Sequence, residues 1–366
     1  AKAIKKAELD LKEVKDYFKL NHIETYDLAY YTRILKEEKY SIDEKVLKNY
    51  FEFEDVLSYL HRFIENFYSL EIKESSIESY NNDVRVYEIY KEGKLISYYF
   101  LDAFYRKWKR PWAWADNLRE KEYFPDFWVP VILNVCNFQK ANSWKTTLYL
   151  RDVETLFHEF WHALHELLSE SKYSELSGFW VEWDFVELPS QLLENWVSDK
   201  DSLKKLSKHI ETWENFSDEI MTKLEKIKTF MTGIFVARQN EFALLDMSLY
   251  SSEIPKSTEE LDRKILEIVN KYSIFKRWED YKMYCSFNHI FGWWYAAGYY
   301  SYMWAEIIEA DVFSRIKEMW MFSSVTWEKL LKTIIWQWTR KKATDLFFDF
   351  MWREVENKAF MERYGL

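Results

Sequence analysis

His158, Glu159 and His162 form an H-E-x-x-H pattern within the segment Thr155–His165. On a helix, two residues that are four apart lie one above the other on the same face, so the two imidazoles could bind a single Zn²⁺ ion. Glu159 would then lie beside the open position of the metal, where a base is needed. The pattern predicts a catalytic zinc site, although it also occurs by chance, and a histidine on an apolar helix is usually a packed one.

A catalytic zinc site needs a third protein ligand. Glu187 lies a short way downstream, in the segment Asp184–Trp196, on the next expected helix. His165 is the competing ligand, but it would lie roughly 10 Å along the helix axis from His158, which makes a shared ion difficult. Glu194 and Asp184 are candidates for orienting the histidines by hydrogen bonds.

The zinc pattern is expected on a helix, because its apolar residues recur at helical spacing without proline or glycine between them. Asp152 is the expected N-cap of that helix. Residues 1–80 and 151–366 show helical patterns throughout. We therefore predict a mainly α zincin-like fold, with breaks marked by Gly233 and Pro255.

Residues 81–150 are expected to form a small antiparallel β-sheet beside the zinc helix. Residues 83–90 and 95–104 should form a hairpin around a turn with Gly93 at a positive φ, and residues 129–138 and 146–150 are two further strand candidates. Such a sheet could hold an extended substrate by β-addition, or it could only support the zinc helix. The sequence favours neither role.

Bulk composition excludes several classes of protein. The 366 residues are 48% hydrophobic and carry a net charge of −10 without a basic stripe, so nucleic acid is not an expected partner. Cys136 and Cys285 give no disulfide framework and suit the cytoplasm. No apolar run approaches the length of a membrane span, and the residues from Ala1 onward lack the apolar core of a signal peptide.

Several segments together resemble the thimet oligopeptidase family of zinc metallopeptidases. They are Glu154–His165, Ser177-Gly178, Asp184–Trp196, His289–Tyr302 and residues 350–355. The resemblance implies a metalloendopeptidase with one Zn²⁺ on His158, His162 and Glu187, and with Glu159 as the base. It also implies short peptides as substrates.

Members of this family have longer chains, in which an N-terminal helical part forms the far wall of a deep channel. By resemblance, residues 1–366 are a single catalytic domain equivalent to the C-terminal half. The other half is expected as a separate partner chain.

Tyr295, Tyr299 and Tyr302 are spaced to share one face of a helix, with His289 just upstream. Spacing alone favours an aromatic core stripe. The family resemblance instead implies that His289, Tyr295 and Tyr302 bind substrate and stabilise the tetrahedral intermediate, with Tyr299 as a further substrate contact. The segment around Gly292 would then act as a hinge.

Tryptophan occupies several positions at which the local sequence favours glycine. The chain has six glycines and 19 tryptophans, whereas glycine usually makes up about 7% of residues. Our hypothesis is that these positions are encoded by UGA, which means glycine in some bacterial lineages and tryptophan in others. The sequence would then have been translated with the wrong genetic code. The alternative is a genuinely tryptophan-rich protein. The suspected positions are Trp112, Trp144, Trp161, Trp180, Trp213, Trp293, Trp294, Trp320, Trp327, Trp338 and Trp352.

Two other functions remain open. One is a different zinc hydrolase with the same ligand set, such as an aminopeptidase, although no motif for binding a terminal amine is recognisable. The other is an inactive, zinc-free fragment that pairs with a partner chain.

Overall fold

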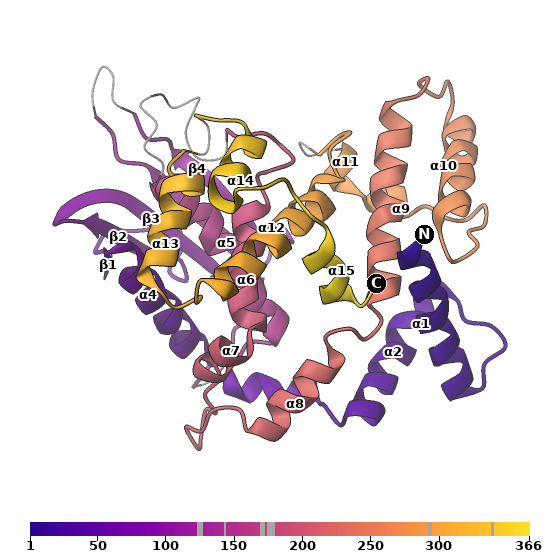
Figure 1. The fold of residues 1–366 in the computed structure, drawn as a ribbon, viewed down its shortest axis with the longest axis horizontal. Coiled ribbons are helices and arrows are strands. Elements are labelled where there is room, and N and C mark those ends of the chain that lie inside the picture. The colour runs from indigo at the N-terminus through magenta and orange to yellow at the C-terminus, as the bar shows by residue number, and fades with distance from the viewer. Residues whose placement is uncertain (123–126, 143, 169–172, 174–179, 292–294, 338–339) are drawn as a thin grey trace. The chain divides into compact units, whose positions relative to one another are not determined.

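The chain folds into two compact units, and each is described by itself. Unit 1 comprises residues 1–42, 222–307 and 357–366, and unit 2 comprises residues 43–221 and 308–356. The computed structural model describes all residues except 123–126, 143, 169–172, 174–179, 292–294 and 338–339 (Figure 1). No helix in the described part of the chain is long and apolar enough to cross a membrane.

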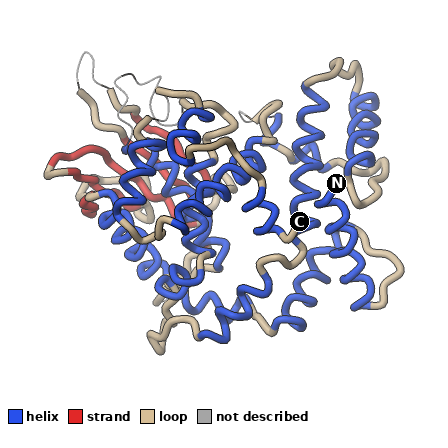
Figure 2. Tube along the Cα trace, viewed as in Figure 1, coloured by secondary structure: helices blue, strands red, loops and turns tan. Residues whose placement is uncertain are grey.

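Unit 2 contains one mixed five-stranded sheet, drawn in red in Figure 2. The strand order is β1-β2-β3-β5-β4, with β4 at one edge. All neighbouring pairs are antiparallel except β3 and β5, which run parallel. The strands are β1 (Leu70–Glu74), β2 (Arg85–Lys91), β3 (Lys94–Phe104), β4 (Trp114–Arg119) and β5 (Val131–Phe138).

The predicted hairpin is confirmed. β2 and β3 are joined by a tight turn in which Glu92 has φ 50° and Gly93 has φ 73°, the two positive values that a type I′ turn requires.

Other details of the predicted sheet are wrong. The sheet is mixed rather than antiparallel, and the prediction of helices up to residue 80 fails at β1. Thr147 forms only an isolated bridge with Glu52, because helix α5 begins directly afterwards, at Leu150.

The zinc pattern lies on α5 (Leu150–Leu168), which packs against β3, β4, β5 and α6 (Leu188–Ser198). Asp152 is not its N-cap but lies inside its first turn, where its carboxylate accepts a hydrogen bond from the Tyr149 backbone N–H at 3.1 Å. The other helical segments of unit 2 are α3 (Glu44–Leu47), η1 (Lys48–Tyr50), α4 (Phe53–Tyr68), α7 (Lys200–Leu206), α13 (Ser324–Leu330), the π-helical turn η4 (Leu331–Ile335) and α14 (Ala343–Met351).

Unit 1 is helical in its described residues, and both chain termini belong to it. Its segments are α1 (Lys2–Phe18), α2 (Thr25–Tyr40), α9 (Thr232–Tyr250), α10 (Thr258–Tyr272), η3 (Met283–Ser286), α11 (Asn288–Phe291) and α15 (Lys358–Tyr364). Helices α8 (Asp218–Ile227) and α12 (Ser301–Glu318) run from one unit into the other along the chain.

The helical break expected at Gly233 lies just before it, because α8 ends at Ile227 and α9 begins at Thr232, and Gly233 itself lies in the first turn of α9. A β-carbon there would lie 2.5 Å from the Ala7 backbone nitrogen on α1, so only glycine permits this close approach.

Backbone geometry bears on the tryptophan hypothesis. Among the described residues, twelve that are not glycine have a positive φ, and six of these are tryptophan. Their side chains are largely exposed, from 57% at Trp112 to 91% at Trp108. Glycine adopts this conformation without strain, whereas a bulky residue does not. The six are Trp108, Trp112, Trp144, Trp213, Trp320 and Trp352.

The remaining suspected positions lack this signature or fall outside the described residues. Trp161 and Trp327 are helical and fully buried, with ring centroids 5.9 Å apart, and Trp180 does not have a positive φ. Trp293, Trp294 and Trp338 lie outside the described residues, as does Gly292 of the predicted hinge.

Candidate metal centre

Two neighbouring helices of unit 2 supply the candidate ligands. His158 and His162 are one turn apart on α5, and Glu187 is the N-cap residue of α6. α6 begins at Leu188, and Pro189 follows in its first turn, where the fixed φ of proline suits a helix. Glu187 is thus the residue at which the chain enters the helix. Since α5 and α6 pack directly against each other, the three side chains meet.

The three donor atoms form a nearly equilateral triangle. His158 Nε2 lies 3.2 Å from His162 Nε2, and each of these nitrogens lies 3.3 Å from Glu187 Oε2. Ligand bonds to zinc of about 2.0–2.1 Å in a tetrahedron separate neighbouring ligand atoms by ~3.3 Å. The described residues therefore fit a tetrahedral metal ion with three protein ligands, as the sequence predicted.

Electrostatics at the triangle favour a positive charge. Burial opposes a charged imidazole, yet the carboxylates of Glu187 and Glu194 raise the pKa of His158 well above its usual value. Burial likewise opposes a charged Glu187, but hydrogen bonds from the two histidines hold its pKa well below the ordinary range. Since a bound cation would replace the proton on these ligands, the same surroundings suit a metal.

Contacts behind the ligands orient them. Glu194 Oε1 lies 2.6 Å from His158 Nδ1, which directs Nε2 of the same ring toward the other ligands. Of the two orienting residues that the sequence offered, the structure thus pairs Glu194 with His158.

Ser190, which sequence reasoning missed, donates to Glu187 Oε2 at 3.1 Å. Its position three residues after Glu187, in the first turn of α6, was the available signal.

Glu159 follows His158 on α5 and is 6% exposed. Burial raises the pKa of its carboxyl, although the charges of His158 and His162 work against this. Its Oε2 atom has no hydrogen-bond partner among the described residues. A buried carboxylate with an unused acceptor and a raised pKa suits a general base.

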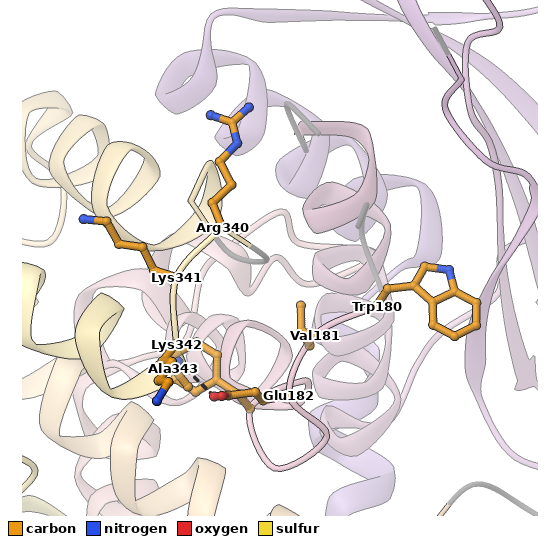
Figure 3. A pocket seen from close by; sticks show the side chains of 8 residues that line it. Trp180, Val181, Glu182, Arg340, Lys341, Lys342 and Ala343 are labelled. Carbon is orange, nitrogen blue, oxygen red and sulfur yellow. Dashed lines mark hydrogen bonds between the residues drawn. The ribbon is translucent and has the colours of Figure 1, made fainter. Parts of the chain in front are cut away.

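His165, the competing third ligand, does not belong to the candidate metal-binding group formed by the described residues, and it is fully buried. Glu182, a further carboxylate shortly before Glu187 in the chain, does not belong to this group either. Glu182 accepts a hydrogen bond from the Ala343 backbone N–H at 2.9 Å, on the wall of a hollow of about 390 Å³. Figure 3 shows Glu182 next to Ala343, with the Arg340 side chain pointing away from it.

The predicted aromatic group assembles in unit 1. The rings of Tyr295 and Tyr302 stack at 4.9 Å, and the His289 ring lies 6.0 Å from Tyr295 and 6.2 Å from Tyr302. The Tyr299 ring is 5.3 Å from that of Tyr302, and its hydroxyl lies 3.1 Å from Gln239 Oε1.

The spacing of the three tyrosines predicted that they share one helix, and this prediction is wrong. Helix α12 begins only at Ser301. Before it, the Asp246 carboxylate accepts hydrogen bonds from the backbone N–H groups of Ala297 and Tyr299, both at 2.9 Å. These bonds hold residues 295–300 in turns.

The mainly helical fold, with a His-His-Glu group on two packed helices, is that of a metallopeptidase. Residues 1–366 match Peptidase family M3 over their whole length, so the chain belongs to this family. The resemblance found in the sequence is thereby confirmed.

The chain is 33% identical over 358 residues to oligopeptidase A of Escherichia coli, covering 96% of this chain and 53% of that protein. It is also 33% identical over 303 residues to dipeptidyl carboxypeptidase of the same organism, covering 78% of this chain and 43% of that protein. The chain thus spans about half the length of the curated relatives it matches.

Solved structures show the same fold. A carboxypeptidase of Pyrococcus furiosus matches 94% of this chain and 67% of its own, with a TM-score of 0.51 at 12% identity. PZ peptidase A with an inhibitor matches 72% of this chain and 42% of its own, with a TM-score of 0.50 at 19% identity.

Proposed function

We propose that this chain is the catalytic part of a zinc-dependent oligopeptidase that hydrolyses internal peptide bonds of short peptides. The observation that carries the proposal is the triangle of His158, His162 and Glu187 donors, which has the edge length of a tetrahedral zinc site. The buried carboxylate of Glu159 beside it supplies a base.

When bound, zinc supplies Lewis-acid polarisation of the scissile carbonyl and of the attacking water. Glu159 takes a proton from that water and delivers it to the leaving amine, a transfer that its raised pKa favours. Glu194 keeps His158 in the orientation and tautomer that bind metal.

Short peptides are the proposed substrates because the relatives include proteins named oligopeptidase A. β4 is at an edge of the sheet and α5 packs on it, which supports the proposal that an extended peptide adds to this strand. For His289, Tyr295 and Tyr302 we propose the role that the family resemblance implies, hydrogen bonding to the substrate and to the developing oxyanion. A reducing compartment such as the cytoplasm suits the two cysteines, Cys136 and Cys285.

Replacing the base tests the mechanism. Glu159→Gln is expected to keep one zinc per chain and to lower turnover of a short quenched peptide about 10²- to 10⁴-fold, because the amide cannot accept a proton. Glu182→Gln is the matched control, since its carboxylate contacts Ala343 instead, and it should retain activity. Substantial peptidase activity in Glu159→Gln would refute the assigned base.

Zinc content separates this proposal from the alternative of an inactive fragment that pairs with a partner chain. Purified protein is expected to hold stoichiometric zinc and to lose it in Glu187→Ala, as measured by elemental analysis. Protein that takes up no zinc under saturating conditions would support the inactive fragment instead.

A further inference from the structure

A second cavity lies wholly within unit 1, in residues that the proposed chemistry does not use. It has a volume of about 360 Å³ and is lined by α2, α9 and the segment that follows α10. Leu28, Ile234 and Ile274 contribute apolar walls, and Arg238, Glu241 and Arg277 contribute charge. A cavity of this size with apolar walls and a few polar groups is typical of small-molecule sites.

Arg277 is the unusual member of this group. Its side chain is 7% exposed, and its Nη1 donates to Thr25 Oγ1. Neither Nε nor Nη2 has a hydrogen-bond partner among the described residues. Buried donors are nearly always satisfied, so two donor nitrogens of one guanidinium without an acceptor indicate that a ligand supplies one.

The nearest carboxylate does not satisfy these donors. Glu241 Oε1 lies 3.7 Å from Arg277 Nη2, beyond hydrogen-bonding distance, and it accepts from Arg238 instead. The charged residues that line the cavity are thus two guanidinium groups and one carboxylate, which leaves one positive charge. Burial also lowers the pKa of Arg277, as expected for a guanidinium that lacks full compensation.

The geometry of the unused donors indicates the ligand. Nε and Nη2 lie on the same edge of a guanidinium, and their parallel N–H groups match the two oxygens of a carboxylate. The aromatic rings of Phe275 and Tyr281 lie 5.7 and 5.2 Å from the Arg277 Cζ, and Leu28, Ile234 and Ile274 give the same cavity apolar walls.

We propose that this cavity binds a small molecule with one carboxylate on an apolar body, and that Arg277 recognises the carboxylate. A medium-chain fatty acid or the C-terminus of a short apolar peptide could supply this chemistry. The inference does not depend on the proposed peptidase function, because it involves neither the metal ligands nor Glu159.

Isothermal titration calorimetry on the full chain tests the proposal, with octanoate, octanamide, Leu-Leu and Leu-Leu amide as probes. We expect saturable binding of octanoate or Leu-Leu at one per chain, and at least about tenfold weaker binding of the matching amide, which lacks the charge. Tighter binding of octanoate than of Leu-Leu would indicate a fatty acid as the ligand, and the reverse order would indicate a peptide C-terminus. Equal binding of acid and amide, or no saturable binding of either acid, would overturn the proposal.

Variants locate the site. Arg277→Met keeps the length of the side chain but removes its charge, and should weaken binding about tenfold or more. Lys276→Met, which removes an exposed neighbouring charge, should leave binding unchanged. If Arg277→Met fails to fold, Ala29→Phe decides instead, because it places a ring at the exposed rim of the cavity. Loss of binding in Ala29→Phe supports the site, and unchanged binding refutes it.

Discussion

At the scale of single residues, the tryptophans with positive φ are the most anomalous feature of the chain. The left-handed conformation costs an ordinary L-residue roughly 1–2 kcal/mol, whereas glycine is free of this strain but loses about 0.5–1 kcal/mol of backbone entropy. Burial does not offset the strain, since Trp108, Trp144 and Trp352 are 91%, 80% and 76% exposed. These observations support the hypothesis that the natural chain has glycine at these positions.

Each of Trp108→Gly, Trp144→Gly and Trp352→Gly is therefore expected to raise the free energy of unfolding by ~0.5–1 kcal/mol, measured by urea denaturation. Trp278→Gly is the control, because Trp278 is also exposed but does not have a positive φ, and it should not stabilise. The hypothesis fails if the three variants behave like the control, or if these codons are UGG in the gene.

His61 predicts a pH dependence of stability. It lies on α4, 4.8 Å from the Tyr87 ring, and burial, helped by the charge of Arg85, lowers its pKa to about 4. At pH values between the folded pKa of about 4 and the unfolded pKa of ~6.5, the unfolded chain binds a proton at His61 that the folded chain does not. The free energy of unfolding therefore falls as the pH falls through this range.

Replacing His61 by phenylalanine removes that proton uptake. When the pH is lowered from 7.5 to 5, the free energy of unfolding of His61→Phe should therefore rise by ~2 kcal/mol relative to that of the wild type. The reason for this size is that pH 5 lies about 1.5 units below the unfolded pKa. Urea denaturation at the two pH values measures the difference. Parallel pH curves for the two proteins would show that His61 does not titrate as its burial predicts.

At the scale of secondary-structure elements, the metal site depends on how α6 meets α5. α6 supplies the candidate ligand Glu187 at its start and the residue that contacts His158, Glu194, two turns later. One helix thus fixes both the position of the third ligand and the orientation of a histidine on its neighbour.

Glu194→Gln is expected to weaken zinc binding about 10- to 100-fold, because the amide holds the His158 ring less firmly and lowers its basicity. Competition with a chromogenic zinc chelator measures the dissociation constant without relying on activity. Glu182→Gln again serves as the matched control. Wild-type zinc affinity in Glu194→Gln would mean that the contact at 2.6 Å does not orient the ligand.

At the scale of the whole molecule, the described metal ligands belong to one unit and the Arg277 cavity to the other. The proposed zinc ion would bind the folded state and not the unfolded chain, so it should stabilise the fold by ~2.7 kcal/mol at a free concentration of 100 times its dissociation constant. That stabilisation should fall mainly on the elements that carry the ligands.

Removing zinc with a chelator is therefore expected to speed hydrogen exchange in α5 and α6 and to leave α9 and α10 of unit 1 largely unchanged. Mass spectrometry of pepsin fragments measures both sets of helices in one experiment. A uniform rise in exchange across both units would show that the two units unfold together.

Local periodicity decided much that could be predicted from the sequence. The four-residue spacing of His158 and His162 fixes their common face on any α-helix, and a turn centred on Gly93 between two alternating segments specifies a hairpin. The family could be recognised for the same reason, because its motifs are short contiguous segments. These features depend on neighbours in the chain, so residue order alone determines them.

Contacts between distant segments decided the rest. The parallel pairing of β3 with β5 and the edge position of β4 depend on which strands meet. The Asp246 carboxylate accepts hydrogen bonds from the backbone of Ala297 and Tyr299 and holds this segment in turns, so that the helix expected from Tyr295 begins only at Ser301. Whether Glu187 or His165 joins the two histidines is set by the packing of α6 on α5. Tertiary packing is needed for each of these because the free energy that selects it comes from surfaces buried between segments, which no local pattern contains.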